Sequence, residues 1–252
     1  QYFYTHYAPR FATHGNLAQL LASEAQSNES GTRLALVLSD LNAAGFEYRH
    51  QQLSANACKP VLAWLAAFHA RFIHQTPDGL WPQGSYWHLA TRPDEFRKMA
   101  DGPLKQFGPA FDKTLRQCPY RTLIHGDAKV ANFCFSADGQ AVAAVDFQYV
   151  GGGIGVQDVA YFLGSVLSEQ DLLKHTEDCL DYYFSELHSA LSQQLAPEEC
   201  VALCNSWRQL YCVANADFHR FLAGWSPEHF KINRMLQQQT EQAVALLSAR
   251  PM

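Results

Sequence analysis

The pattern of hydrophobic and polar positions predicts short elements at the start of the chain. Residues 1–21 mix aromatic and apolar side chains without one clear period, and we expect them to be helical in part. Residues 33–38 (RLALVL) predict a short buried strand, which follows a polar turn at residues 26–32. Residues 39–45 are rich in turn-forming residues and predict a connector.

The middle of the chain predicts a helix, a long loop and a small β element. Apolar residues recur at intervals of three and four over residues 60–72, which predicts a helix. Residues 75–92 are dense in proline, glycine and aromatic residues and predict a loop of the kind that carries function. Strands are predicted at residues 121–124, 133–135 and 141–145, and the turn sequence SADGQ joins the last two.

The chain after the glycines at 151–153 predicts helices. An apolar stripe with alternating intervals of four and three runs from residue 200 to residue 221. No internal repeat or low-complexity linker interrupts the sequence after residue 42. We therefore expect an α+β fold, in which residues 42–252 form one mostly helical domain around a small β element.

Composition and charge exclude several classes of protein. Hydrophobic residues make up 48% of the chain and charged residues 17%, as in ordinary globular proteins. The net charge of -5 argues against a broad surface for nucleic acid or anionic membranes. The longest apolar run, residues 61–68, is far too short for a membrane span, and no signal-sequence pattern opens the chain. We predict a soluble protein without nucleic-acid or membrane partners.

Cysteine usage predicts a compartment. There are seven cysteines, an odd number without any CxxC pair, which predicts reduced thiols and a cytoplasmic protein. The histidines are dispersed and form no HExxH or other metal-ligand spacing. The first residue is glutamine, so we expect that the chain does not begin where its gene does.

The most informative stretch is LIHGDAKVANFCFSADGQAVAAVDFQ, residues 123–148. One loop between short strands carries, in order, His125, Asp127, Lys129 and Asn132. The hairpin that follows returns the chain so that Asp146 can face Asn132. Phosphoryl transfer needs such groups: a carboxylate for the attacking hydroxyl, an amide oxygen and a carboxylate for Mg²⁺, and a cation for the transferred phosphate. The step from Asp127 to Asn132 and the later Asp-Phe match the kinase catalytic loop and metal-binding motif.

HGDxKxxN followed by DFQ resembles the motifs of the aminoglycoside phosphotransferase and choline kinase superfamily, which has HGD where protein kinases have HRD. The resemblance is closest to the ecdysteroid-kinase-like branch. Further matching segments lie at residues 36–41, 65–72, 84–95, 155–163 and 217–229. The resemblance implies a protein-kinase-like fold and a kinase that uses ATP and Mg²⁺ to phosphorylate an alcohol group of a small molecule.

The resemblance also implies residue roles. Asp127 would be the catalytic base, and Asn132 and Asp146 would hold Mg²⁺. Lys129 would contact the transferred phosphate, although a solvated surface charge stays an open alternative. Backbone groups of the hinge would line the adenine pocket at Ser39, Asp40 and Leu41.

Other residues would support the loop or border the acceptor. The resemblance implies that His125 braces the catalytic loop and that Asp158 anchors it. His69 lies on an apolar helix and is interpreted as a hydrogen-bonded core histidine. In the family, the acceptor cleft is bordered by segments that here contain Tyr86, Trp87, Asp217, Arg220 and Trp225. For the two tryptophans, packing of the long loop onto the helices is the favoured alternative.

Residues 1–41 depart from the family pattern. They contain no Gly-rich loop and no lysine, since Lys59 is the first lysine of the chain. The opening QYFYTHYAPRF resembles the segment after the helix glutamate of the N-terminal lobe. We therefore expect residues 1–41 to be a remnant of that ATP-binding lobe and hinge, residues 42–252 to be the helical catalytic and acceptor-binding lobe, and this chain alone to bind ATP poorly and turn over little.

Two functions stay open. The first is a small-molecule kinase, and the second is a catalytically inactive kinase-like module that binds a ligand or partner through its helical lobe. A protein kinase fits less well, because HGD replaces HRD and no APE-like segment follows DFQ. The sequence leaves the acceptor and the oligomeric state open.

Overall fold

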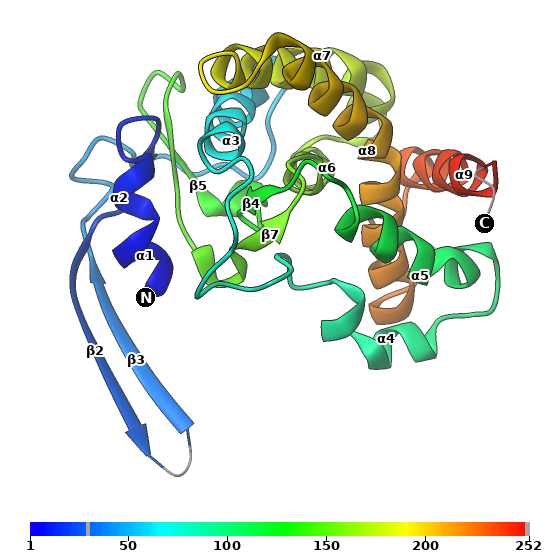
Figure 1. Ribbon diagram of the computed structural model, residues 1–252, viewed down its shortest axis with the longest axis horizontal. Helices are drawn as coiled ribbons and strands as arrows, with labels where there is room; N and C mark the ends of the chain where they lie inside the picture. The colour runs from blue at the N-terminus through cyan, green and yellow to red at the C-terminus, as the bar shows by residue number, and fades with distance from the viewer. Residues whose placement is uncertain (29–30, 250–252) are drawn as a thin grey trace.

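The computed structural model describes residues 1–28 and 31–249. The helices are α1 (Tyr2–His6), α2 (Ala8–Phe11), α3 (Lys59–Arg71), α4 (Pro93–Lys98), α5 (Pro103–Arg116), α6 (Val156–Val166), α7 (Glu169–Leu191), α8 (Pro197–Trp225) and α9 (Arg234–Ser248). The strands are β1 (Asn16–Leu17), β2 (Leu20–Asn28), β3 (Gly31–Leu38), β4 (Thr122–Ile124), β5 (Phe133–Phe135), β6 (Val142–Ala144) and β7 (Gly151–Gly153). In Figure 1 the central strands β4, β5 and β7 lie between the N-terminal segment and the helices of the C-terminal half. The predicted α+β class is confirmed.

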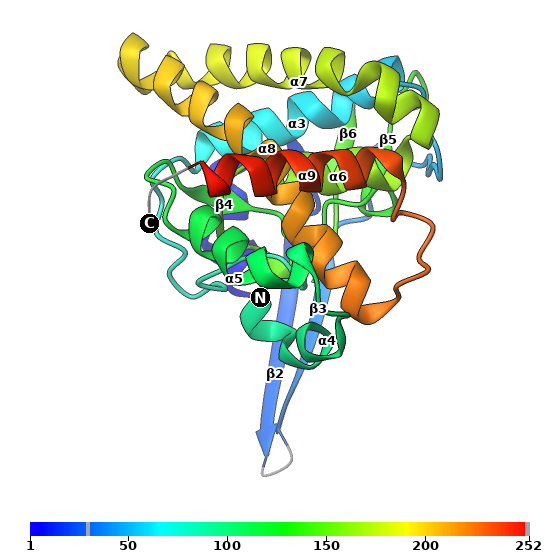
Figure 2. The same cartoon turned by 90° about the vertical axis from the view of Figure 1, so that its right-hand side faces the viewer.

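The long hairpin of β2 and β3 corrects two predictions. The strands pair antiparallel from Leu20 opposite Leu38 to Asn28 opposite Gly31. The predicted turn at residues 26–32 is therefore too long, because β2 continues to Asn28; residues 29 and 30 of that turn lie outside the described residues. The predicted burial of residues 33–38 is wrong, since the side chains of Leu34 and Val37 are 46% and 54% exposed. Much of the hairpin extends away from the helical body in both views (Figures 1 and 2), whereas Leu20, Leu36 and Leu38 are half-buried against the core.

The helical body follows the predicted periodicity. Helix α3 covers nearly all of the predicted range 60–72, and Val61, Leu65 and Phe68 are completely buried. It packs against α7, while α8 contacts α5, α6 and α9. The predicted stripe at residues 200–221 lies along α8 and is buried, except that Cys204 is half-buried. Residues 250–252, the end of the predicted helical domain, lie outside the described part of the chain.

The small β element holds the candidate loop from both sides. Strands β5 and β6 form the predicted antiparallel hairpin, and β1 adds to β6 in parallel. Strand β4 pairs antiparallel with β7, a strand that the sequence pattern did not predict because glycine disfavours strands. Glycine is needed in β7 because a Cβ on Gly151 would lie 2.3 Å from the carbonyl oxygen of Trp81. The glycines thus let the backbone of the long loop lie directly against the sheet.

The described residues contain no helix that is both long enough and apolar enough to cross a membrane. All seven cysteines lie in the described part of the chain and carry free thiols.

Candidate active site

The candidate catalytic loop leaves the sheet at the end of β4 and returns to it at β5. Gly126 has a φ of 80°, and a Cβ there would lie 2.2 Å from the carbonyl oxygen of Tyr149. A residue without a side chain is therefore required between His125 and Asp127. The loop ends in a single 3₁₀ turn, Val130–Asn132, directly before β5.

Asp127 is buried and its two carboxylate oxygens differ in their surroundings. Oδ2 accepts hydrogen bonds from Lys129 Nζ at 3.0 Å and from Asn132 Nδ2 at 3.1 Å. Oδ1 is buried and has no hydrogen-bond partner in the described residues. The Asn132 amide also donates to the backbone carbonyl of Asp127 at 2.8 Å, which fixes the loop across its five-residue span. One carboxylate oxygen of Asp127 is thus held in place, while the other is buried without a hydrogen-bond partner in the described residues.

Asp146 follows the hairpin and lies next to this loop. The N–H of Val145 donates to the carbonyl of Asn132 at 2.9 Å, so the end of β6 is fixed against the catalytic loop. Asp146 itself adopts a left-handed conformation, with a φ of 65°, which aspartate tolerates better than most residues. Its side chain is exposed, and its charge adds to the effect of burial that raises the pKa of Tyr4 to about 12. The structure thus brings Asp146 near Asn132, as the sequence predicted.

Asp158, at the start of α6, binds the backbone of the HGD segment. Its Oδ2 accepts a hydrogen bond from the N–H of His125 at 2.6 Å, and its Oδ1 accepts one from Gly126 at 3.0 Å. The ring of His69 also reaches Asp158, with Nε2 at 3.1 Å from Oδ2, and its Nδ1 lies 2.9 Å from the hydroxyl of Tyr183. A buried carboxylate with three donors is well satisfied and holds the loop rigid.

His125 is completely buried and bonded as a neutral imidazole. Its Nδ1 accepts a hydrogen bond from the N–H of Asp127, and its Nε2 lies 2.8 Å from the carbonyl oxygen of Val145. Since a carbonyl only accepts, the proton belongs on Nε2. Burial lowers the pKa of His125, which keeps the ring neutral despite the nearby carboxylates. His125 therefore connects the catalytic loop to the strand that carries Asp146.

The predicted acceptor residues differ in how far they are buried. Arg220 is completely buried; its Nε donates to Asp217 at 2.9 Å and its Nη2 donates to the carbonyl of Trp87 at 2.7 Å. Trp87 is buried as well, whereas Trp225 is 56% exposed. Arg220 thus connects α8 to the long loop at residues 75–92. Oδ2 of Asp217 and Nη1 of Arg220 are buried without a hydrogen-bond partner in the described residues.

Two residues to which the sequence assigned no role interact electrostatically with Asp127. The hydroxyl of Tyr161, on α6, is 3.1 Å from that of the predicted residue Tyr86. Burial raises the pKa of both phenols, and the carboxylate of Asp127 adds to each shift. The second of these residues is Lys231, between α8 and α9. Burial lowers the pKa of its ammonium to about 8, and the negative charge of Asp127 opposes that shift. Tyr161 lies in the matching segment 155–163, which assigned it no role, and Lys231 lies outside the matching segments.

The predicted hinge residues form the connection between β3 and the helical body. The N–H of Ser39 donates to the carbonyl of Gln19 at 2.8 Å, and its hydroxyl accepts from the N–H of Gln19. Asp40 Oδ1 accepts from the N–H of Asn42, and Leu41 is buried. In the described residues, the carbonyl of Ser39 and the N–H of Leu41 have no hydrogen-bond partner.

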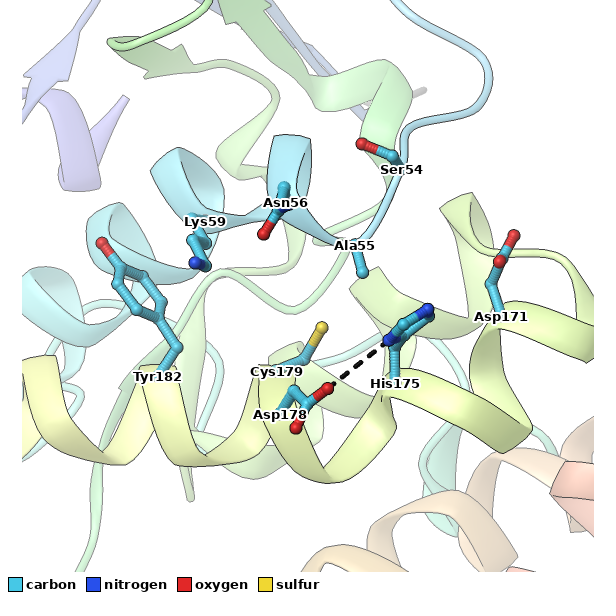
Figure 3. Close-up of a pocket in the computed structure, with 9 residues that line it drawn as sticks. All are labelled: Ser54, Ala55, Asn56, Lys59, Asp171, His175, Asp178, Cys179 and Tyr182. Atoms are coloured by element: carbon cyan, nitrogen blue, oxygen red, sulfur yellow. Dashed lines mark hydrogen bonds and ion pairs between the residues drawn. The ribbon is translucent and has the colours of Figure 1, made fainter.

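A separate hollow of about 490 Å³ opens between the start of α3 and helix α7. Lys59 and Tyr182 lie at one side of it and Asp171 and His175 at the other (Figure 3). None of the candidate site residues lines it. The chemistry of the HGD loop is therefore not located in this hollow.

Comparisons with known proteins agree with the motifs. Residues 85–195 match the family model described as "Ecdysteroid kinase-like family". No curated protein sequence matches the chain significantly. Among solved structures, the chain is similar to amicoumacin kinase hAmiN in complex with AMP-PNP, Ca²⁺ and Ami, with a TM-score of 0.60 and 12% identity over 96% of this chain and 76% of that one.

A second similar structure is that of a microcompartment-associated aminopropanol kinase, with a TM-score of 0.55 and 14% identity over 95% of this chain and 77% of that one. At such low identity these two similarities show the fold and not the substrate. The expected resemblance is confirmed: the chain has the protein-kinase-like fold of small-molecule phosphotransferases, and its residues 85–195 match the ecdysteroid kinase-like family.

Proposed function

We propose that this chain carries the catalytic site of an ATP-dependent kinase that transfers the γ-phosphate to an alcohol group of a small molecule. The observation that carries the proposal is the environment of Asp127. One of its oxygens is bonded to Lys129 and Asn132, and the other is buried without a partner. Such a carboxylate is oriented by the protein and keeps one oxygen for the hydroxyl of an acceptor.

Asp127 would orient the acceptor hydroxyl and accept its proton through Oδ1. Lys129 is paired with Oδ2, and its side chain is 39% exposed, so its ammonium can also reach solvent and a phosphate that enters from there. A cation at that position would offset charge on the transferred phosphoryl group. Asp127 and Lys129 thus supply the proton acceptor and the positive charge that the reaction requires.

Asn132 and Asp146 fit a hard divalent cation. The amide nitrogen of Asn132 is used by Asp127, while its carbonyl oxygen has no partner in the described residues. With the exposed carboxylate of Asp146 it offers two oxygen donors, the ligands that Mg²⁺ prefers. The described residues contain no cluster of three or more His, Cys, Asp or Glu side chains that could hold a metal ion, which fits a site completed by nucleotide phosphates and water. When bound, Mg²⁺ would neutralise phosphate charge.

The hinge supplies groups for a nucleotide base. The edge of adenine carries a hydrogen-bond donor beside an acceptor, and the free carbonyl of Ser39 and N–H of Leu41 match them. Ser39, Asp40 and Leu41 are accordingly our proposed adenine contacts. The kinase proposal is favoured over an inactive binding module because the polar groups of the HGD loop are oriented for chemistry.

The proposal is tested with the protein expressed from its complete gene, by ADP release from Mg-ATP over a panel of small alcohols. Asp127→Asn keeps the shape of the side chain but removes its basicity, so we expect transfer to fall by about 10²-fold or more. Asp178→Asn, a change at an exposed aspartate on α7, should leave the rate unchanged. If Asp127→Asn retains the wild-type rate with an accepted alcohol, the assigned role is wrong. If no alcohol stimulates ADP release, the inactive module becomes the better description.

A further inference from the structure

Lys231 lies beside the aromatic rings of Tyr161 and Phe218, in a segment whose backbone is fixed. The segment between α8 and α9 turns through a hydrogen bond from the N–H of Ile232 to the carbonyl of His229, at 2.8 Å. The N–H of Lys231 donates to Nδ1 of His229, and the side chain of Asn233 caps α9. Because the N–H groups of Lys231 and Ile232 are both bonded to His229, the side chain of Lys231 projects from a defined position.

The ammonium of Lys231 lies over aromatic rings. Nζ is 5.0 Å from the ring centroid of Tyr161 and 5.8 Å from that of Phe218. These rings belong to a buried aromatic cluster with Trp87 and Phe221, and Tyr86 packs against it. Aromatic faces attract a cation, but they do not neutralise its charge.

Lys231 has no carboxylate partner within ion-pair distance in the described residues. The neighbouring cation Arg92 differs, since its guanidinium lies 3.7 Å from Glu95 and donates to the backbone carbonyl of Tyr86. The nearby carboxylate Asp127 is already bonded to Lys129. The aromatic cluster that contains the predicted acceptor residue Trp87 thus has beside it a half-buried positive charge that is not balanced by a bonded anion.

We propose that Lys231 is a specificity-determining residue of the acceptor site, which favours alcohols that carry an anionic group and disfavours amino alcohols. This inference rests on the proposed kinase function and names the charge class of its acceptor. A carboxylate on the acceptor would balance the ammonium of Lys231 where water is partly excluded, whereas an acceptor ammonium would be repelled. The aromatic cluster would contact the apolar part of the same molecule.

The test uses three alcohols that share a hydroxymethylphenyl group and differ in the charge of the para substituent: 4-(hydroxymethyl)benzoate, benzyl alcohol and 4-(hydroxymethyl)benzylamine. Binding to the protein from the complete gene is measured at pH 7 by ligand-detected NMR titration without nucleotide. We expect the wild type to bind the carboxylate about tenfold more tightly than the amine. Lys231→Gln should abolish this preference, and Lys231→Arg should retain it. Lys174→Gln removes the same charge from an exposed position on α7 and should leave the preference unchanged.

A second measurement, ADP release with the same alcohols, separates this inference from the proposed function. If the carboxylate binds through Lys231 but no ADP is released, the kinase proposal fails and the charge preference stands. If ADP is released with the same kcat/KM for all three alcohols, the kinase proposal stands and the role of Lys231 is wrong. The role is also wrong if the carboxylate does not bind the wild type, or if Lys231→Gln keeps the wild-type preference.

Discussion

Two residues of the candidate site, one in the HGD loop and one after the β5–β6 hairpin, have a positive φ. Gly126 combines a positive φ with a close backbone approach, and Asp146 is a non-glycine residue in the left-handed region. Such conformations are costly and persist where the surrounding structure holds them. Here the holding groups are Asp158, which binds the backbone of Gly126, and the bond from Val145 to Asn132. Among the described non-glycine residues, Asp146 shares a positive φ with His74 and Ser85, and of these three only Asp146 is a proposed metal ligand.

The requirement for glycine at position 126 can be separated from the general cost of a positive φ. Gly139 has a φ of 68° and nothing within 4 Å of an added Cβ, so Gly139→Ala should cost about 1 kcal/mol of unfolding free energy. Gly126→Ala adds a collision with the backbone of Tyr149. We expect it to cost at least about 1 to 2 kcal/mol more, as measured by urea denaturation. Equal losses in the two variants would contradict the close approach.

The site residues differ in how far sequence alone could predict them. Asp127, Asn132 and Asp146 lie in one short motif, so local spacing was sufficient to bring them together. Tyr161 and Lys231 come from distant parts of the chain, and no local pattern predicts their approach to the loop. The contact of Lys129 with a phosphate stays a prediction.

Elements were predictable where their own sequence determines them. Helix α3 and the β5–β6 hairpin follow from apolar spacing and from a strong turn, and both were predicted nearly to the residue. Strand β7 consists of glycines and exists because β4 and the loop at Trp81 pair with it. The burial of β3 was wrong for a related reason: exposure depends on what covers a strand, which its own residues do not determine.

The packing of α8 on α9 predicts a dependence of stability on pH. His219 on α8 lies 2.8 Å from the hydroxyl of Thr240 on α9, and burial lowers the pKa of His219 to about 4. The unfolded chain, with a histidine pKa of about 6.5, binds the proton more readily. The contribution of His219 to the free energy of unfolding is therefore fully present above about pH 6.5. It is lost as the pH decreases toward 4, by up to about 3 kcal/mol.

Comparison with His219→Asn isolates this contribution. The variant is expected to be less stable at pH 7, and its deficit relative to the wild type should shrink as the pH falls from 6.5 to 4. The measurement is the free energy of unfolding in urea at several pH values. His88 and His125, whose pKa values burial also lowers, are present in both proteins and cancel in the difference. A deficit independent of pH would show that His219 does not carry the effect.

At the scale of the whole molecule, the described chain combines a helical body with a hairpin that extends away from it (Figure 2). The motifs predicted the protein-kinase-like fold because a few residues at fixed spacing are specific to it. The division into residues 1–41 and 42–252 stays a prediction. The acceptor could not be predicted, since the residues proposed to border it come from distant segments that no single motif describes.

The measurement that tests the central claim most directly is ³¹P NMR of the protein from its complete gene, incubated with Mg-ATP and an alcohol that stimulates ADP release. We expect a phosphate monoester resonance to appear as ATP is consumed, because the γ-phosphate is transferred to oxygen of the alcohol. Removal of the metal with EDTA should abolish this resonance, since Asn132 and Asp146 are proposed to act through Mg²⁺. Consumption of ATP to ADP and inorganic phosphate alone, or a monoester formed at the same rate in EDTA, would contradict the account.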